Sequence, residues 1–110
     1  MIVAFVPDLM DRSKVQAASA GEEVRWLASA AELPLAAAEA GCRLVVVDLA
    51  RSGVLGALPA VVATGADVVA FGSHVDRAVL DAARAAGCGT VLARSEFFRR
   101  LEELLAGPTT

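Results

Sequence analysis

The chain has 110 residues, 56% of them hydrophobic, and its 13 acidic and 10 basic residues give a formal net charge of −3. This length suits one domain with a single core, and the charge balance leaves no basic stripe for a phosphate backbone, which argues against direct nucleic-acid binding. No apolar stretch reaches the roughly 20 residues that span a bilayer. The N-terminus lacks the basic start of a signal peptide, so we expect a cytoplasmic protein.

Five short runs rich in β-branched residues alternate with alanine-rich, helix-like segments. This alternation predicts a parallel sheet with helices on both faces. The runs LVVVD and VVAF are almost wholly apolar, as expected of central strands, whereas EVRWL alternates like an edge strand. The predicted strands are Ile2–Val6, Glu23–Leu27, Arg43–Asp48, Asp67–Phe71 and Thr90–Ala93.

Capping patterns precede two of the predicted helices. Ser29 with Glu32, and Ser73 with Asp76, have the Ser-x-x-acid spacing in which a hydroxyl satisfies a free amide of the first turn. His74, the only histidine, would lie in the first turn of the fourth helix. No nucleophile and base accompany it, so we favour helix capping and loop packing over catalysis for Ser73 and His74.

The two cysteines occupy matching contexts, EAGCRLVVV and AAGCGTVLA. Cys42 and Cys88 each follow a glycine, Gly41 or Gly87, that would end a helix, and each precedes an apolar strand. Both would lie at the amino edge of the sheet, far from a site at the opposite edge. We predict two small buried thiols and no disulfide.

Proline and glycine limit the remaining helices. Pro34 and Pro59 forbid uninterrupted helix around them unless each lies in a first turn, so we expect short or late-starting helices there. The last helix should be continuous up to Gly107-Pro108 and carry one apolar stripe. That stripe consists of Phe97, Leu101, Leu104 and Leu105.

Five strand–helix units in about 110 residues match the flavodoxin-like, doubly wound α/β fold with strand order 2-1-3-4-5. We predict a single domain over residues 1–107 and a tail over residues 108–110. Ligands of such sheets bind beyond the carboxyl ends of the strands. The glycines there form no G-x-G-x-x-G or Walker-type loop, so the common kinds of nucleotide binding are not indicated.

At those strand ends, RLVVVDLARSG, ADVVAFGSHVD and TVLARSEFF resemble the third to fifth strands of response-regulator receiver (CheY-like) domains. The resemblance covers essentially the whole chain. It implies a two-component signalling module in which Asp48 matches the phosphoacceptor aspartate of a phosphorelay. It also implies that the fourth helix, fifth strand and fifth helix, here residues 74–105, form a face for dimers or partners.

Most of the other receiver positions are changed. The acidic pair that holds Mg²⁺ in receivers reads Val6-Pro7, with Asp8 one residue further on. The serine or threonine that contacts the phosphoryl group in receivers matches Gly72, with Ser73 displaced by one. The resemblance therefore implies a degenerate receiver, or pseudo-receiver.

Two further positions of the receiver pattern fall at the start of the last helix, where Arg94 replaces a lysine and Ser95 a cis-proline. Without a metal, phosphoryl oxygens would face an anionic Asp48, and transfer would be very slow. An arginine fork suits a carboxylate, so we predict that Asp48 forms an ion pair with Arg94 in place of the metal, or that it is held by backbone amides. We expect no Mg²⁺ and no other cofactor; if a metal binds, Asp8 and Asp48 would hold it.

Aromatic residues are the candidates for a protein interface. Trp26 would cover the edge of the sheet, with partner binding as the alternative. Phe97 and Phe98 are adjacent in a predicted helix and point about 100° apart, so we expect only one to face the core.

These observations favour a non-enzymatic, receiver-like module that is not phosphorylated by the usual Mg²⁺-dependent route and acts through protein–protein contacts, with a signalling partner or with itself as a dimer. One alternative is a phosphorylatable response regulator with Asp48 as acceptor. Another is a domain that binds a small anionic ligand at the carboxyl edge. That edge comprises Asp8, Asp48, Ser73, His74 and Arg94.

Overall fold

Five parallel strands form one sheet in the order β2-β1-β3-β4-β5 in the computed structural model, which describes residues 1–106. The predicted fold class and strand order are therefore confirmed. The predicted helix stop at Gly107-Pro108, the domain end at residue 107 and the tail lie outside the described residues. The strands are β1 (Ile2–Phe5), β2 (Val24–Trp26), β3 (Leu44–Asp48), β4 (Asp67–Gly72) and β5 (Thr90–Ala93).

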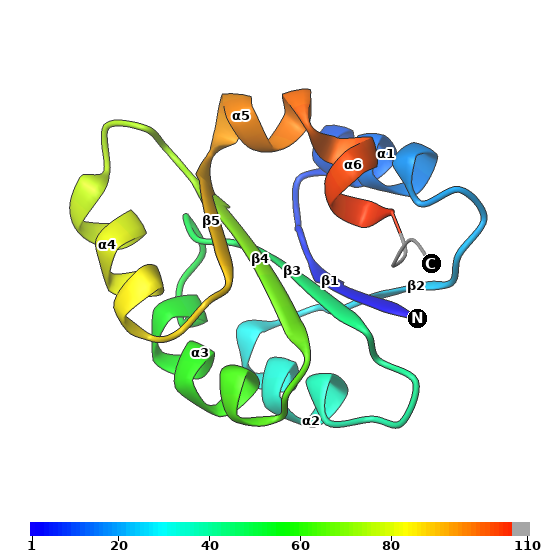
Figure 1. Cartoon of the computed structure of the whole chain (residues 1–110), viewed down its shortest axis with the longest axis horizontal. Coiled ribbons are helices and arrows are strands. Elements are labelled where there is room, and N and C mark those ends of the chain that lie inside the picture. Colours follow the sequence, from blue (N-terminus) through cyan, green and yellow to red (C-terminus); the bar gives the residue numbers. More distant parts are fainter. Residues whose placement is uncertain (107–110) are drawn as a thin grey trace.

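Helices cover both faces of this sheet (Figure 1). The helices α2, α3 and α4 pack on one face, and α1, α5 and α6 pack on the other. None of the helices within residues 1–106 has the length and apolar character needed to cross a membrane. The helical elements are α1 (Leu9–Ala18), the 3₁₀ turn η1 (Ala30–Glu32), α2 (Leu33–Ala37), α3 (Val54–Ala63), α4 (Arg77–Ala85), α5 (Arg94–Arg99) and α6 (Leu101–Leu105).

The strand boundaries follow the apolar pattern closely. β5 has the predicted bounds, and β3 is buried along its whole length, as its continuous apolar run predicts. The edge strand β2 is shorter than predicted. Its flanking residues still pair with β1, because Ile2 N donates to Glu23 O at 2.9 Å and Leu27 N donates to Ala4 O at 2.9 Å.

The two prolines behave differently. Pro34 lies in the first turn of α2, which is only five residues long, as predicted. Pro59 lies inside α3, so the prediction is wrong there, although the ring removes one helical donor. Packing keeps α3 continuous, since Val54, Leu58 and Val61 on its inner side are all 0% exposed.

The last helix is broken in two at Arg100, whose backbone has φ −105° and ψ 17°. Both aromatic residues of α5 pack on Phe71 of β4: the Phe97 ring stacks on it at 4.3 Å, and the Phe98 ring meets it edge-on at 5.5 Å. Only Phe97 is fully buried, and Phe98 is half-buried. Phe97 is therefore the one that faces the core, as expected, although the half-buried Phe98 also packs against it. The apolar stripe is confirmed, with Leu101 and Leu105 buried and Leu104 half-buried.

Of the two predicted capping boxes, only the first forms. The Glu32 carboxylate accepts from the amide nitrogens of Ala28 and Ser29, both at 2.8 Å. In the second, Ser73 Oγ accepts weakly from Val75 N at 3.4 Å, and α4 begins only at Arg77. His74 is therefore in the turn before α4 and not in its first turn.

The cysteine loops meet the amino edge of the sheet and both thiols are free, as predicted, but each is only half-buried rather than buried. Gly87 ends α4 with φ +100°; its amide donates to Arg84 O at 3.0 Å, and the Cys88 amide donates to Ala83 O at 3.3 Å. Burial raises the pKa of both thiols, Cys42 and Cys88. Each is a packing residue rather than a reactive one.

Candidate functional site

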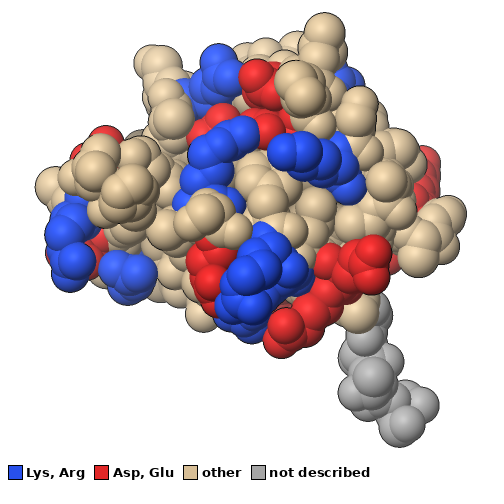
Figure 2. All heavy atoms as spheres, turned by 90° about the horizontal axis from the view of Figure 1, so that it is seen from above, with Lys and Arg blue, Asp and Glu red and all other residues tan. Residues whose placement is uncertain are grey.

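The loops that follow β1, β3 and β4, together with the start of α5, surround a hollow of about 320 Å³ at the carboxyl edge of the sheet. Acidic and basic side chains are interleaved on the face seen in Figure 2, rather than separated into patches of one sign. The hollow itself contains three carboxylates and two guanidinium groups. Its lining residues are Asp8, Asp11, Asp48, Ala50, Arg51, Phe71, Gly72, Ser73 and Arg94.

Asp48 ends β3 at this hollow, and its side chain is bound to its own loop. One carboxylate oxygen accepts from Ala50 N at 3.0 Å, and the other accepts from Arg51 Nε at 3.3 Å. The residue is only 4% exposed. The predicted ion pair between Asp48 and Arg94 is therefore wrong, because the cation that neutralises Asp48 is Arg51, three residues along the same turn. The other partner considered for Asp48, a backbone amide, is observed at Ala50.

Arg94 begins α5 and pairs across the layer with Asp11 of α1. The Asp11 side chain is 2% exposed and the Arg94 side chain 47%, so an outer cation covers an inner anion. The hydrogen bond from Arg94 to Asp11 raises the pKa of the guanidinium. The guanidinium also lies 5.7 Å from the ring centroid of Phe71 and 5.0 Å from that of Phe98.

Asp8 determines where α1 begins. It is the N-cap of α1, and its carboxylate accepts from Asp11 N at 3.0 Å, which lowers the pKa of Asp8. Because α1 begins at this point, Asp11 and Val15, which are four residues apart, lie on the side of the helix that faces the sheet. This cap places the buried carboxylate of Asp11 in the hollow.

The structure brings together five of the site residues expected from the sequence, namely Asp8, Asp48, Gly72, Ser73 and Arg94. Two others, His74 and Ser95, do not line the hollow. His74 is exposed in the loop before α4, and Ser95 is exposed in the first turn of α5.

Gly72 occupies the position of the serine or threonine of receivers and provides no hydroxyl, although a side chain there would make only ordinary van der Waals contacts. A Cβ at Gly72 would lie 3.4 Å from side-chain atoms of both Leu49 and Leu80. The hydroxyl nearest to the hollow is therefore that of Ser73, one residue further on and exposed.

Sequence reasoning missed Asp11 and Arg51, the two residues that complete the charge balance of the site. Asp11 had a detectable signal, because it is a charged residue on the same helical stripe as Val15. The signal for Arg51 was weaker and consisted only of its position in the turn, three residues after Asp48.

The donors in the hollow do not fit the Mg²⁺ that the receiver pattern implies. Within residues 1–106, no three His, Cys, Asp or Glu side chains lie close enough together to hold a metal ion. Asp11 and Asp48 already pair with arginines. A divalent cation in the hollow would compete with these two guanidinium groups for its oxygen ligands.

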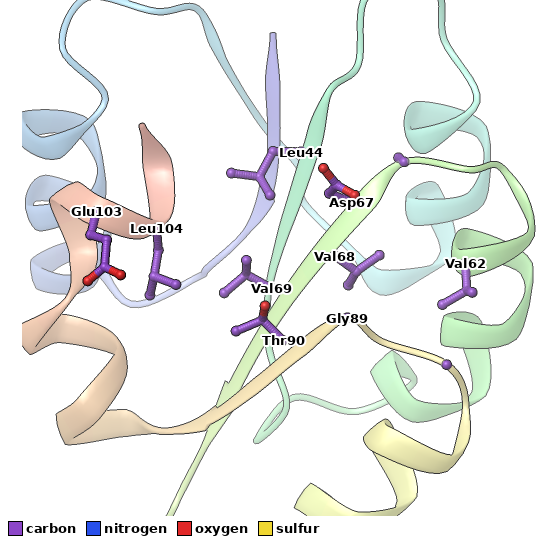
Figure 3. Close-up of a pocket in the computed structure, with 11 residues that line it drawn as sticks. Leu44, Val62, Asp67, Val68, Val69, Gly89, Thr90, Glu103 and Leu104 are labelled. Carbon is purple, nitrogen blue, oxygen red and sulfur yellow. The ribbon is translucent and has the colours of Figure 1, made fainter. Parts of the chain in front are cut away.

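A second hollow, of about 410 Å³, lies at the opposite, amino edge of the sheet between the starts of β4 and β5 and the helix α6 (Figure 3). Its charged lining residues are both acidic. Glu103 already pairs with Arg100 at 3.1 Å, and Asp67 stands at the start of β4. This hollow has no basic lining residue, so it offers nothing to hold an anionic ligand.

Comparison with known proteins supports the fold. No protein-family model matches the sequence, and no curated protein does. Among solved structures, the receiver domain of NtrX from Brucella abortus is 18% identical with a TM-score of 0.74, covering 96% of this chain and 97% of that one. A response regulator from Thermotoga maritima is 15% identical with a TM-score of 0.72, over 96% and 97%.

A third similar structure is the CheY-like protein tadZ from Pseudomonas aeruginosa, with 20% identity and a TM-score of 0.66 over 99% of this chain and 96% of that one. At identities this low, the likeness establishes the fold and leaves the chemistry to be argued from the residues. The chain has the CheY-like receiver fold of two-component response regulators.

Proposed function

We propose that this chain is a receiver-like signalling module that is not phosphorylated by the usual Mg²⁺-dependent route and acts through contacts with other proteins. Proteins with this fold in two-component signalling are generally signalling modules rather than enzymes, and they interact with other proteins. The fold supports the general assignment as a signalling module. The charge pattern of the hollow supports the loss of the phosphorylation step.

One observation carries the proposal: each buried carboxylate in the hollow has an arginine as its counterion. Arg51 neutralises Asp48, and Arg94 neutralises Asp11. Arginine stays protonated at every physiological pH, so these charges are permanent. Both Asp48 oxygens accept hydrogen bonds from the protein, which lowers their availability to attack phosphorus.

The test is the intact mass of the chain after incubation with Mg²⁺ and acetyl phosphate. We expect no phosphoryl adduct on the wild type or on Asp48→Asn, while a phosphorylation-competent receiver domain treated in parallel gains one. NMR shifts recorded during a Mg²⁺ titration should show no saturable change at the hollow. An adduct on the wild type that is missing from Asp48→Asn would establish a working phosphoacceptor and overturn the proposal.

A second candidate function is the binding of a small anion in the same hollow. It is favoured by the exposure of the two arginines, because the Arg51 and Arg94 side chains are 42% and 47% exposed and can each contact a solute without leaving their carboxylates. A ligand that binds only the native state raises the melting temperature. We expect phosphate or a dicarboxylate to do so in the wild type, at constant ionic strength, and not in Arg94→Met.

A further inference from the structure

A separate, shallow hollow of about 510 Å³ lies between α1 and the edge strand β2. It is lined mainly by apolar atoms of α1 and by Trp26, the only tryptophan of the chain. It shares no lining residue with the charged hollow at the carboxyl edge. Its lining residues are Leu9, Arg12, Ser13, Gln16, Ala17 and Trp26.

The outer side of α1 carries an uncharged strip with Arg12 beside it. Ser13 follows Leu9 by four residues, and Gln16 and Ala17 follow Ser13 by three and four, spacings that place these residues along one side of the helix. Leu9 is 74% exposed, one of four large hydrophobic residues so exposed within residues 1–106. Small side chains on this face let the backbone of another helix come close.

The one charged lining residue of this hollow is a cation without an anionic partner. The Arg12 guanidinium lies 4.8 Å from the ring centroid of Trp26 and forms no ion pair with any residue in 1–106. No Asp or Glu lines the hollow. The whole chain has a formal net charge of −3, whereas the charge on this patch is positive.

We propose that the surface made by Leu9, Arg12, Ala17 and Trp26 docks a helix of a partner protein, one with apolar side chains on one face and carboxylates beside them. The apolar side chains would cover Leu9 and Trp26, and a carboxylate would pair with Arg12. Tryptophan and arginine are the residue types that most often dominate binding energy at protein interfaces. The hollow is too shallow to enclose a small molecule, whereas a helix covers such a surface.

This inference rests on the proposed function only in that both require a protein partner. The two can fail separately, because phosphorylation is measured at Asp48 and docking is measured at Trp26. With one tryptophan and no tyrosine in the chain, tryptophan emission reports on this hollow alone.

The probes are two synthetic amphipathic helical peptides with the same leucine face, one flanked by glutamates and the other by lysines. Titration of the glutamate peptide into the chain should shift the Trp26 emission and saturate, and the lysine peptide should bind about tenfold more weakly, equivalent to about 1.4 kcal/mol. Arg12→Glu should reverse this order. Leu9→Ser should weaken the glutamate peptide about tenfold.

Val75→Ser is the matched control, because Val75 is also 74% exposed but lies outside this hollow. It should leave both affinities unchanged. Equal binding of the two peptides, an unchanged order in Arg12→Glu, or no emission change with either peptide would overturn the proposal. A Trp26 emission that changes with the concentration of the chain in the absence of peptide would also overturn the proposal, because a second copy of the chain would then cover this surface.

Discussion

Removal of the Arg94 cation should destabilise the fold through the anion that it covers. In Arg94→Met the side chain keeps most of its apolar stem over Phe71 and Phe98, while Asp11 stays buried without its counterion. The second oxygen of Asp11 is buried and has no hydrogen-bond partner within residues 1–106, so the neighbouring groups offer no alternative donor. Loss of one partner from a fully buried pair costs roughly 3–5 kcal/mol.

The expected cost is smaller here, because Arg94 is about half-exposed and solvent screens part of the attraction. We predict a loss of about 2 kcal/mol in the free energy of unfolding, which for a domain of this size lowers the melting temperature by about 10 °C. Urea denaturation at neutral pH measures the first quantity and calorimetry the second.

A double-mutant cycle with Asp11→Asn isolates the pair from the other contacts of Arg94. Asparagine removes the buried charge, so Arg94→Met in that background should lose only the cation–π contacts, about 1 kcal/mol or less. If Arg94→Met lowers the free energy of unfolding equally in the presence of Asp11 and of asparagine, the ion pair contributes nothing to stability. The reasoning that Arg94 is the counterion of a buried Asp11 would then be refuted.

Two further predictions concern the scaffold. The ion pair with Arg43 lowers the pKa of Glu22 to about 2. Because this pKa is lower in the folded state than in the unfolded state, the ionised carboxylate stabilises the fold above pH 4.5 by about 2 kcal/mol. This contribution should be lost as the pH falls from 4.5 toward 2. In acid titrations followed by circular dichroism, Glu22→Gln should not show this loss. Gly87→Ala should cost about 2 kcal/mol, since Gly87 has φ +100° and a Cβ there would lie 3.1 Å from Val62 Cγ1. Gly89→Ala, where a Cβ meets nothing within 4 Å, should be nearly neutral in urea denaturation, and an equal loss in both variants would contradict the strain argument.

The fold was predictable because each strand carries its own signal. The buried run Leu44–Asp48 could only be a central strand, and the parallel order followed from the alternation of strands with helices. The errors lie where tertiary packing outweighs local preference. Pro59 is tolerated because α3 is anchored on the core, and the break at Arg100 accompanies two adjacent phenylalanines that both pack on the sheet.

The candidate site was predictable in its location and not in its pairing. The sequence brings Asp48 and Arg94 to one edge, but a long arginine side chain can reach several carboxylates from there. Which one it pairs with depends on the helical phase set by the Asp8 cap, which turns Asp11 inward. The spacing of Asp11 and Val15 indicates that Asp11 faces inward, but its pairing with Arg94 depends on how α1 and α5 are arranged in space.

Permanent side-chain counterions have a consequence for how such a module would carry information. A site balanced by Mg²⁺ and a transferable phosphoryl group has two chemical states, and a kinase sets the ratio between them. A site balanced by Arg51 and Arg94 has a single charge state at every physiological pH. Under the proposed function, the signal received by a partner would therefore be the amount of the protein itself, and control would pass to its synthesis and its degradation.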